Sequence, residues 1–571
     1  MIRLRPAPGS LALAGVALAA LSAAFTAPVA AKPARQAAAG TTAAAAPALD
    51  VALMRQVIAD LASDAMEGRG PATPAEPRVL DYIIGQFKAA GLKPGNKGQW
   101  LQDVPTVSIT GSQFSPLTVT GGSTPLRFEP VKDFVAFSYR AVPQTAISEA
   151  DLVFVGYGIR APELGWDDYA GVDIKGKIAV VLVNDPDYTA SDETGPFKGR
   201  RMTWYGRWPY KYEEAARQGA RGVLIVHDTY PAAYGWNVVA STSTRNFIQT
   251  PNNGMDQTEA NGWIQKATAE AIFTAAGKDF AALSAAAAKP GFRAVPLGLK
   301  ASYSFTNTVK TSISHNVVGL LPGKAAPDET VLYSGHWDHL GRCKPDATGD
   351  DICNGAVDNA TGIAGIVALA KANAAAGPAR RSQAFIALTL EESGLLGSEY
   401  YAANPVFPLA RTAGGVNLDG LSPGGRARDF TMSGGEKSDL NALFRKHLAA
   451  LGYVEAPEGN PERGGYYRSD HFSLAKRGVP VYSFGRGSDL EVGGKAAGEA
   501  AAEDYTRNRY HQPNDAYSPD WDMSGMVQEV DLAYRLGREL ADGTAWPNWL
   551  PGDEFRAVRD ASRAGGKPAA K

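Results

Sequence analysis

The chain has 571 residues and a formal net charge of −2 at neutral pH. This length exceeds what one hydrophobic core usually occupies, so we expect two or more domains. A nearly neutral chain offers no surface charge for a polyanion, so nucleic acid is not an expected partner, and 44% hydrophobic residues is ordinary for a soluble globular protein.

The N-terminus has the order of a secretory signal peptide. Arg3 and Arg5 precede an apolar run over residues 11–25, and small residues follow at 27–31. We therefore predict a signal peptide over residues 1–31 and export to the periplasm or beyond the cell. The apolar run is short for a membrane span, and no later run is long enough to form one.

Folded elements are predicted after an Ala- and Pro-rich linker, residues 32–49. Apolar residues at helical spacing predict a helix that begins after Asp50 and a second helix that ends near Gly91. Strand-like and helical segments then alternate from about residue 128 to residue 304, and this block interrupts the pattern that resumes near Phe305. The block is therefore predicted to be an inserted domain.

Three short apolar segments each end in residues that can bind a metal. They are residues 331–335 before His336, residues 384–390 before Glu391 and Glu392, and residues 415–418 before Asp419. A helical pattern lies between the first two segments, and buried strands that alternate with helices predict a parallel sheet. Such sheets bind ligands beyond the carboxyl ends of their strands. We therefore expect these side chains to converge on one crevice.

The donor set predicted for this crevice comprises imidazoles and carboxylates. Its members are His336, Asp358, Glu392, Asp419 and His511. Zn²⁺ binds imidazole nitrogen and carboxylate oxygen, and a catalytic zinc site keeps one position open. Two histidines and three carboxylates suit two zinc ions with one bridging carboxylate, and other divalent metals also fit. Asp338, two residues after His336, is placed to accept the second N–H of that ring.

The cysteines of the chain, Cys343 and Cys353, lie close together in the same ligand-bearing region. In an exported protein this spacing predicts a local disulfide, which stabilises by about 2–3 kcal/mol in the chain-entropy model. Metal binding by the two thiols is the alternative. The neighbouring imidazoles and carboxylates already supply a full donor set without them.

Several motifs occur in the order found in one family of hydrolases. They are Gly335-His336-Trp337-Asp338, Gly355 to Gly362, Glu391 to Ser398, Asn417-Leu418-Asp419, Arg468 to Phe472, and Tyr510-His511. With these motifs the chain resembles the co-catalytic two-zinc exopeptidases. That family includes secreted leucyl-type aminopeptidases, glutamate carboxypeptidase, glutaminyl cyclase and the transferrin receptor. The resemblance implies an α/β fold with a mixed, mostly parallel sheet, helices on both faces, and an inserted, β-rich protease-associated domain.

The patterns and the resemblance together predict how the chain divides, and the resemblance assigns roles to residues. The expected parts are the signal peptide (1–31), the linker (32–49), the catalytic domain (50–127 and 305–550), the inserted domain (128–304) and a disordered tail (551–571). The implied roles are one metal held by His336 and Asp419, a second held by Glu392 and His511, a bridge by Asp358, a general base in Glu391, and Tyr510 as the residue that steadies the tetrahedral intermediate. A cis peptide bond is expected after Asp358.

The function implied is that of a secreted aminopeptidase with two zinc ions and peptide substrates that have a free N-terminus. A carboxypeptidase or dipeptidase with the same metals is the nearest alternative. A glutaminyl-cyclase-like acyl transferase is less favoured because cyclases lack the inserted domain. A non-catalytic, receptor-like protein is disfavoured because this chain keeps the complete ligand set together with Glu391.

Overall fold

The computed structural model describes residues 48–240 and 244–564. The predicted signal peptide, residues 1–31, lies outside the described residues, as does the linker up to residue 47. Within the described part of the chain, none of the helices combines the length and the apolar character needed to cross a membrane.

The catalytic sheet predicted from the sequence is present. Its strands in spatial order are the C-terminal part of β13 (Val295–Leu321), β17 (Arg381–Leu388), β14 (Ala326–His336), β18 (Thr412–Asn417), β21 (Val481–Arg486) and β19 (Asp429–Met432). The four strands from β17 to β21 are mutually parallel, while the flanking strands β13 and β19 run antiparallel to their neighbours. A mixed, mostly parallel sheet is therefore confirmed.

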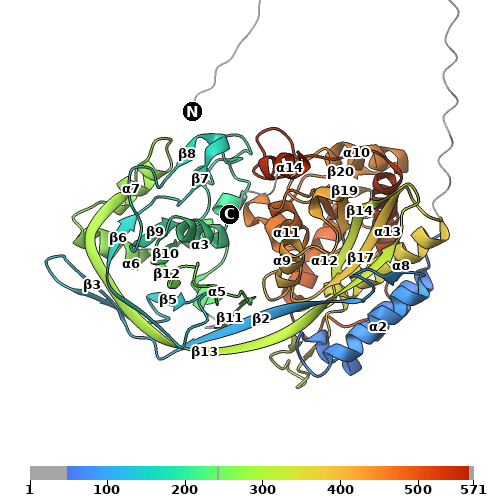
Figure 1. The fold of residues 1–571 in the computed structure, drawn as a ribbon, viewed down its shortest axis with the longest axis horizontal. Coiled ribbons are helices and arrows are strands. Elements are labelled where there is room, and N and C mark those ends of the chain that lie inside the picture. Colours follow the sequence, from blue (N-terminus) through green and yellow to red (C-terminus); the bar gives the residue numbers. More distant parts are fainter. Residues whose placement is uncertain (1–47, 241–243, 565–571) are drawn as a thin grey trace, which may run out of the picture. The chain divides into compact units, whose positions relative to one another are not determined.

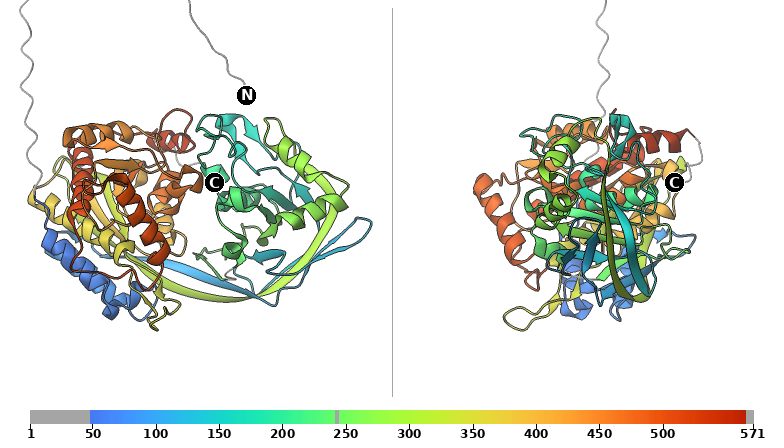
Figure 2. Two further views of the ribbon diagram at one scale, coloured as in Figure 1. Left: turned by 180° about the vertical axis from the view of Figure 1, so that it is seen from behind. Right: turned by 90° about the vertical axis from the view of Figure 1, so that its left-hand side faces the viewer.

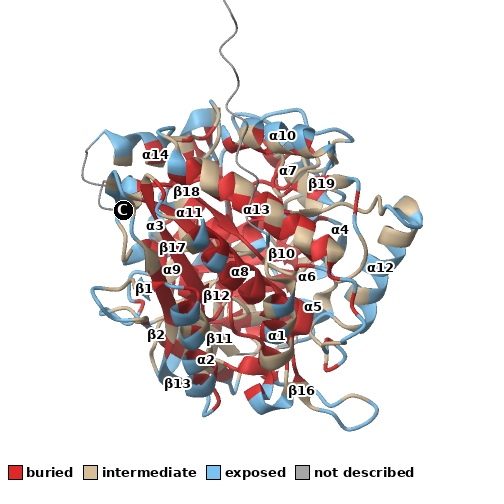
Figure 3. Ribbon diagram, turned by 90° about the vertical axis from the view of Figure 1, so that its right-hand side faces the viewer, coloured by how far each residue is buried: buried red, intermediate tan, exposed pale blue. Residues whose placement is uncertain are grey.

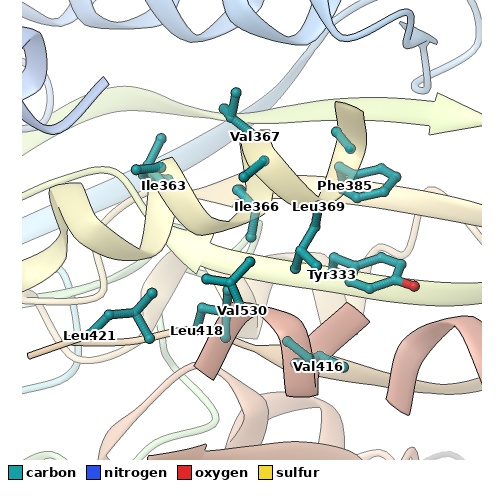
Figure 4. Packing of buried hydrophobic residues seen from close by; sticks show 14 of the residues in the cluster. Tyr333, Ile363, Ile366, Val367, Leu369, Phe385, Val416, Leu418, Leu421 and Val530 are labelled. Carbon is teal, nitrogen blue, oxygen red and sulfur yellow. The ribbon is translucent and has the colours of Figure 1, made fainter. Parts of the chain in front are cut away.

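One face of this sheet is covered by helix α8 (Thr361–Ala375) and helix α13 (Ser524–Asp542). Beneath them the rings of Tyr333 and Phe385, on neighbouring strands, stack with centroids 4.7 Å apart (Figure 4). Helix α13 passes this stack at Gly537, where an added Cβ would lie 2.4 Å from the Tyr333 hydroxyl oxygen. The close approach of helix and ring therefore requires glycine at this position.

The opposite face carries the alternate residues of the same strands, because successive side chains of a strand point to opposite sides. Leu332 and Ile386 lie there, in a cluster with residues of α9 (Leu396–Ala403) and α11 (His471–Lys476). Helices therefore cover both faces of the sheet, as the sequence predicts.

The N-terminal helices α1 (Val51–Leu61) and α2 (Glu76–Ala89) lie against α8, and both are blue in Figures 1 and 2. The Asp50 side chain accepts a hydrogen bond from the backbone N–H of Leu53 at 3.0 Å and caps α1, so the predicted helix start is confirmed. Figure 3 shows α8 as a buried helix between these helices and the sheet. Helix α8 is therefore sandwiched within the core.

The segment predicted to be an insertion contributes its own group of strands. In spatial order after β13 they are β6 (Gln144–Phe154), β9 (Ile178–Leu182), β10 (Gly222–His227), β12 (Ala260–Gln265) and β5 (Phe134–Phe137). Its longer helices are α3 (Trp208–Arg217), α6 (Lys266–Ala275) and α7 (Phe280–Ala287). Strand β2 (Leu101–Ser112) pairs with β13, and β13 continues from these strands into the catalytic sheet (Figure 1).

The predicted boundaries of the insertion, residues 128 and 304, do not match the elements. Strand β3 (Leu117–Thr120) already pairs with β13, and Leu117 and Val119 belong to the same apolar cluster as the core of the insertion. The downstream boundary falls inside β13, which has no break there. A continuous strand keeps the same alternation on both sides of a domain border, so the sequence pattern carries no signal at this point.

The tail predicted as disordered, residues 551–571, is helical in its described part. Helix α14 spans Arg556–Arg563, and its Arg559 is 1% exposed. The Arg559 guanidinium donates hydrogen bonds to the backbone oxygens of Thr412 and Ala413 at 2.9 and 3.0 Å. Polar composition therefore gave a wrong prediction for residues 551–564, because a buried arginine anchors this helix to the sheet. Residues 565–571 lie outside the described residues.

The predicted disulfide between Cys343 and Cys353 is confirmed. It closes a small hairpin formed by β15 (Gly341–Arg342) and β16 (Ile352–Cys353), between the ends of β14 and α8 in the chain. The hairpin therefore lies in the loop that joins two of the predicted metal ligands, His336 and Asp358.

Glu529 of helix α13 predicts a pH-dependent contribution to stability. It is 3% exposed, and burial raises its pKa to about 7 although the nearby Arg486 opposes this. The folded protein thus holds this proton more strongly than the unfolded chain. The stabilisation that comes from this bound proton is complete below about pH 4.5. It is lost as the pH rises through about 7, which lowers the free energy of unfolding by on the order of 3 kcal/mol.

Glu529→Gln should therefore be more stable than the wild type at pH 8 and nearly equal to it at pH 5, measured by denaturant unfolding. Glu539→Gln, on the same helix, is the matched control. The Glu539 carboxylate accepts a hydrogen bond from Lys446 at 2.8 Å, so this substitution removes a charged partner of Lys446 and should not stabilise the protein. A Glu529→Gln protein that is less stable than the wild type at pH 8 would contradict the prediction.

Candidate metal centre

The predicted ligands lie at one edge of the catalytic sheet, where its parallel strands end. His336 is the last residue of β14, Glu391 and Glu392 follow β17, and Asp419 follows β18. Because these three strands are neighbours and parallel, their carboxyl ends bring the four side chains together.

Asp358 lies at the centre of this group. It belongs to the short turn Ala356–Ala360 that leads into α8, and its peptide bond to Asn359 is cis, as the resemblance implies. Asp358 Oδ1 lies 3.3 Å from His336 Nε2, and Asp358 Oδ2 lies 3.4 Å from His511 Nε2. The two oxygens of one carboxylate thus face two different histidines.

The other two acidic residues divide between these histidines. Asp419 Oδ1 lies 3.2 Å from His336 Nε2, whereas Glu392 Oε2 lies 3.0 Å from His511 Nε2. Two donor groups therefore share Asp358. All five residues predicted as ligands take part in these contacts.

His339 is an additional imidazole that the sequence analysis missed. Its Nδ1 lies 2.8 Å from Glu392 Oε1, and its side chain is fully buried. Its donor atom lies within 4.8 Å of ligand atoms of Asp358 and Glu392, so His339, and not His511, completes the second compact set of three donors. The signal was present in the motif His336-Trp337-Asp338-His339, where two histidines follow one strand.

Asp338 contacts the site differently from the expectation. His336 Nδ1 donates its hydrogen bond to the backbone oxygen of Asp338 at 3.1 Å, whereas the Asp338 carboxylate lies 3.7 Å from that nitrogen. The carboxylate instead accepts from the backbone N–H groups of Glu391 and Glu392 at 3.2 and 3.4 Å. Asp338 therefore orients the turn that carries both glutamates.

Asp515 and Asn359 hold the loop that carries Asp358. The buried Asp515 carboxylate accepts from the backbone N–H groups of Val357 and Asp358, both at 3.0 Å. The Asn359 side chain donates to the backbone oxygen of Leu418 at 3.0 Å and so links this loop to the Asp419 loop. Asn359 lies within a sequence motif and Asp515 lies shortly after His511, but the sequence gives no indication of these contacts.

Ser469 orients the carboxylate of Asp419 from the segment between Arg468 and Phe472. Its hydroxyl donates to Asp419 Oδ2 at 2.5 Å and accepts from the Asn417 side chain at 2.9 Å. The segment was noted as a family motif without a role. The structure shows that this segment orients the Asp419 carboxylate through Ser469.

The electrostatics of the metal-free site place protons on histidines and negative charge on carboxylates. Burial opposes protonation of His511, but the facing carboxylates raise its pKa to about 9. Burial also opposes ionisation of Glu392, but His339 and His511 lower its pKa to about 2. Contacts with His336 and His511 hold the pKa of Asp358 well below its ordinary value in spite of burial.

Glu391 and Tyr510 border the donor groups. Burial, together with the charges of Asp419 and other carboxylates, raises the pKa of Glu391 well above its ordinary value. Tyr510 is 46% exposed, and its ring stacks on that of His511 with centroids 3.8 Å apart. Glu391 thus lies in the interior of the site and Tyr510 lies at its solvent side.

The donor set fits divalent metal ions. Among the described residues, Asp358, Glu392 and Asp419 have no lysine or arginine within ion-pair distance, and their charged neighbours are histidines. Clustered carboxylates without a fixed cation, interleaved with imidazoles, are the ligand chemistry that zinc prefers. Metal binding would displace the protons on these histidines.

A cavity of about 260 Å³ lies between the insertion and the catalytic part of the chain. Arg201 and Tyr205 line it from the insertion, and Tyr466 and Tyr467 line it from the catalytic part. Tyr467 lies two residues before Ser469, which contacts Asp419. The cavity thus adjoins the loop that leads into the donor groups.

Comparison with known proteins gives a family for the part of the chain that contains the site. Residues 316–534 match the model of peptidase family M28, a span that includes all five predicted ligands, Glu391 and Tyr510. A probable zinc metalloprotease of Phaeosphaeria nodorum is 26% identical over 257 residues. That match covers 40% of this chain and 48% of the relative, so the chain spans about half the length of that relative.

Solved structures with some similarity include two bacterial aminopeptidases. The aminopeptidase of Aneurinibacillus sp. strain AM-1 has a TM-score of 0.46 at 22% identity, over 87% of this chain and 95% of the other. A zinc aminopeptidase of Bacillus subtilis has a TM-score of 0.41 at 17% identity, over 89% of this chain and 99% of the other.

The geometry predicts that divalent metal stabilises the protein through Asp358. Adding Zn²⁺ to chelator-treated protein should raise the thermal unfolding temperature, because a ligand at about one hundred times its Kd stabilises by about 2.7 kcal/mol. Asp358→Asn should lose most of this shift. Asp346→Asn, in the exposed hairpin loop, is the control and should keep it. An unchanged shift in Asp358→Asn would exclude this site as the place of binding.

Proposed function

We propose that the protein is an exported two-zinc aminopeptidase. Its residues 316–534 are a peptidase family M28 domain, the type of protein that the motifs resemble. The protein would hydrolyse the first peptide bond of peptides that have a free N-terminus. The observation that carries this proposal is Asp358, whose two oxygens face separate histidines and so suit a bridge between two ions. The fungal relative's description as a probable zinc metalloprotease supports zinc as the metal.

The ligand assignment follows the two donor groups. His336 and Asp419 would hold one zinc ion, Glu392 and His511 the other, and Asp358 would bridge them. His339 would orient the carboxylate of Glu392 through its 2.8 Å contact, as ligands in metal sites are commonly oriented by a hydrogen-bonded neighbour. Bound zinc would polarise the scissile carbonyl and acidify the attacking water.

Glu391 is the proposed general base. It is adjacent in sequence to the ligand Glu392, and Asp338 fixes the backbone of both glutamates. Its raised pKa, which burial and neighbouring carboxylates produce, favours acceptance of a proton. Glu391 would take the proton from the attacking water and deliver it to the leaving amine. Tyr510 would steady the tetrahedral intermediate from the solvent side, as the resemblance implies.

The preference for an N-terminal amine rests on the resemblance to leucyl-type aminopeptidases and on charge. Carboxylates crowd the site, and a protonated or metal-facing amine suits such surroundings better than a second carboxylate does. A carboxypeptidase or dipeptidase with the same metals remains the competing proposal. The two differ in which end of the substrate must be free.

Export and the role of the insertion complete the proposal. The predicted signal peptide, residues 1–31, and the disulfide between Cys343 and Cys353 both fit an oxidising compartment. We assign the insertion to the protease-associated class by resemblance. The cavity that it shares with Tyr466 and Tyr467 would receive substrate side chains, because it adjoins the loop to Ser469.

Glu391→Gln should lower kcat by about 10²–10⁴-fold with little change in KM, the usual range for the loss of a general base. The variant should keep the metal content of the wild type, close to two zinc ions per chain. Glu392→Gln is the matched control at the adjacent position and should lose metal together with activity. A Glu391→Gln enzyme that keeps near-normal kcat, or that loses zinc, would show that the role is misassigned.

Free dipeptide amides should be hydrolysed, and their N-acetylated forms should not, because acetylation removes the amine that the acidic site would hold. The measurement is the rate of product release for each pair of substrates, with and without chelator. Cleavage of N-acetylated peptides from the carboxyl end would instead favour the carboxypeptidase proposal.

A further inference from the structure

Arg69 is a fully buried arginine directly behind the candidate metal centre. It is 0% exposed and ends the turn Asp64–Arg69 between α1 and α2. Among the described residues it forms no ion pair within 4 Å, and its side-chain hydrogen bonds go to backbone oxygens. These acceptors are the carbonyl groups of Leu61, Trp337, Asn354, Gly355 and Asp358.

The guanidinium joins the two loops that carry ligands of both donor groups. Nε donates to the Trp337 oxygen at 2.7 Å, one residue after His336. Nη2 donates to the Gly355 oxygen at 2.7 Å and to the oxygen of Asp358 itself at 3.3 Å. The planar fork of arginine presents fixed donors in several directions, so one side chain sets the spacing of both loops.

The backbone of Arg69 is itself tightly held. Glu67, Gly68 and Arg69 have φ angles of 48°, 65° and 50°, in the left-handed region. At Gly68 an added Cβ would lie 2.4 Å from the Gly341 oxygen and 2.6 Å from the Cys353 oxygen. The disulfide hairpin thus packs against Gly68. Non-glycine residues stay in such conformations only where their surroundings hold them, which is frequent near functional sites.

The charge of Arg69 also bears on the centre. Burial lowers its pKa to about 10, although Asp515, Asp358, Asp338 and Glu392 oppose this, so the side chain stays protonated at neutral pH. The guanidinium therefore offsets part of the repulsion among the carboxylates from the protein side. This contribution is present before any metal binds.

We propose that Arg69 is a positioning residue of the metal centre, which fixes the His336 and Asp358 loops in the arrangement that binds metal and partly neutralises their carboxylates. This inference rests on the proposed function in one respect, that metal binds at the two donor groups. It predicts that the site is formed in advance of the metal. Loss of the guanidinium should therefore weaken metal binding specifically, beyond its effect on folding.

Arg559 provides a matched control for the contribution to folding alone. It is 1% exposed, donates only to backbone oxygens, and has a pKa that burial lowers to about 10, but its contacts lie at Thr412 and Ala413, at the far end of β18 from Asp419. Arg559→Lys and Arg69→Lys keep the charge and remove the fork. The difference in metal binding between the two variants therefore measures the effect of Arg69 on the metal centre, apart from the general cost of replacing a buried arginine.

The experiment compares full-length wild type, Arg69→Lys and Arg559→Lys after chelator treatment. Zinc affinity is measured by competition with a chromophoric chelator, and the visible spectrum of the Co²⁺-loaded protein reports ligand geometry. Arg69→Lys should bind zinc about 10- to 100-fold more weakly and give an altered Co²⁺ spectrum, the range seen when residues that orient metal ligands are replaced. Arg559→Lys should match the wild type in both.

Equal zinc affinity and Co²⁺ spectra for the two variants would overturn the inference. Failure of the wild type to bind zinc or cobalt would instead refute the proposed function. If Arg69→Lys does not fold, the inference is tested by measuring backbone amide hydrogen exchange in the metal-free wild-type protein. The segments around Trp337 and Asp358 should stay protected after the metal is removed, because Arg69 holds them, and rapid exchange of both segments in the metal-free protein would reject its positioning role.

Discussion

The rest of the catalytic half depends on how carboxylates are crowded at the ends of parallel strands. Asp358, Glu391, Glu392 and Asp419 would repel one another strongly in a buried crevice if each were ionised without compensation. The protein meets this repulsion with histidines interleaved among the carboxylates, and the Ser469 hydroxyl donates to Asp419. The raised pKa of Glu391 is one result of burial and of this repulsion. A divalent ion relieves the same repulsion more completely.

The sequence predicted the positions of those site residues that lie at the ends of strands. His336, Glu392 and Asp419 each follow an apolar strand, and parallel pairing of β14 with β17 and β18 makes their convergence a geometric necessity. Asp358 and His511 do not follow strands of the sheet, so spacing alone could not bring them into the group. These two residues were candidates because zinc binds carboxylate and imidazole, and the resemblance then gave them roles. The structure brings both close to the other donors.

Other features depend on contacts between residues far apart in the chain. Asp515 binds the backbone of Val357, and Arg69 binds that of Asp358, through bonds that no local pattern indicates. Arg559 anchors a helix in a polar tail that composition alone makes resemble disorder. The border predicted at residue 304 falls inside β13, which continues without a break, so no local pattern marks it.

The pairing of β2 with β13 bears on how such a protein can change in evolution. Ser112 and Thr306 face each other across the ladder, so the chain leaves for the insertion and returns from it at adjacent points. A short turn could join these two residues without altering the register of the remaining ladder. The insertion is thus a detachable module in a topological sense. Its removal would uncover the aromatic surface of Tyr467 and Phe472, which now contact Trp204, so a chain without it would need a more polar surface there.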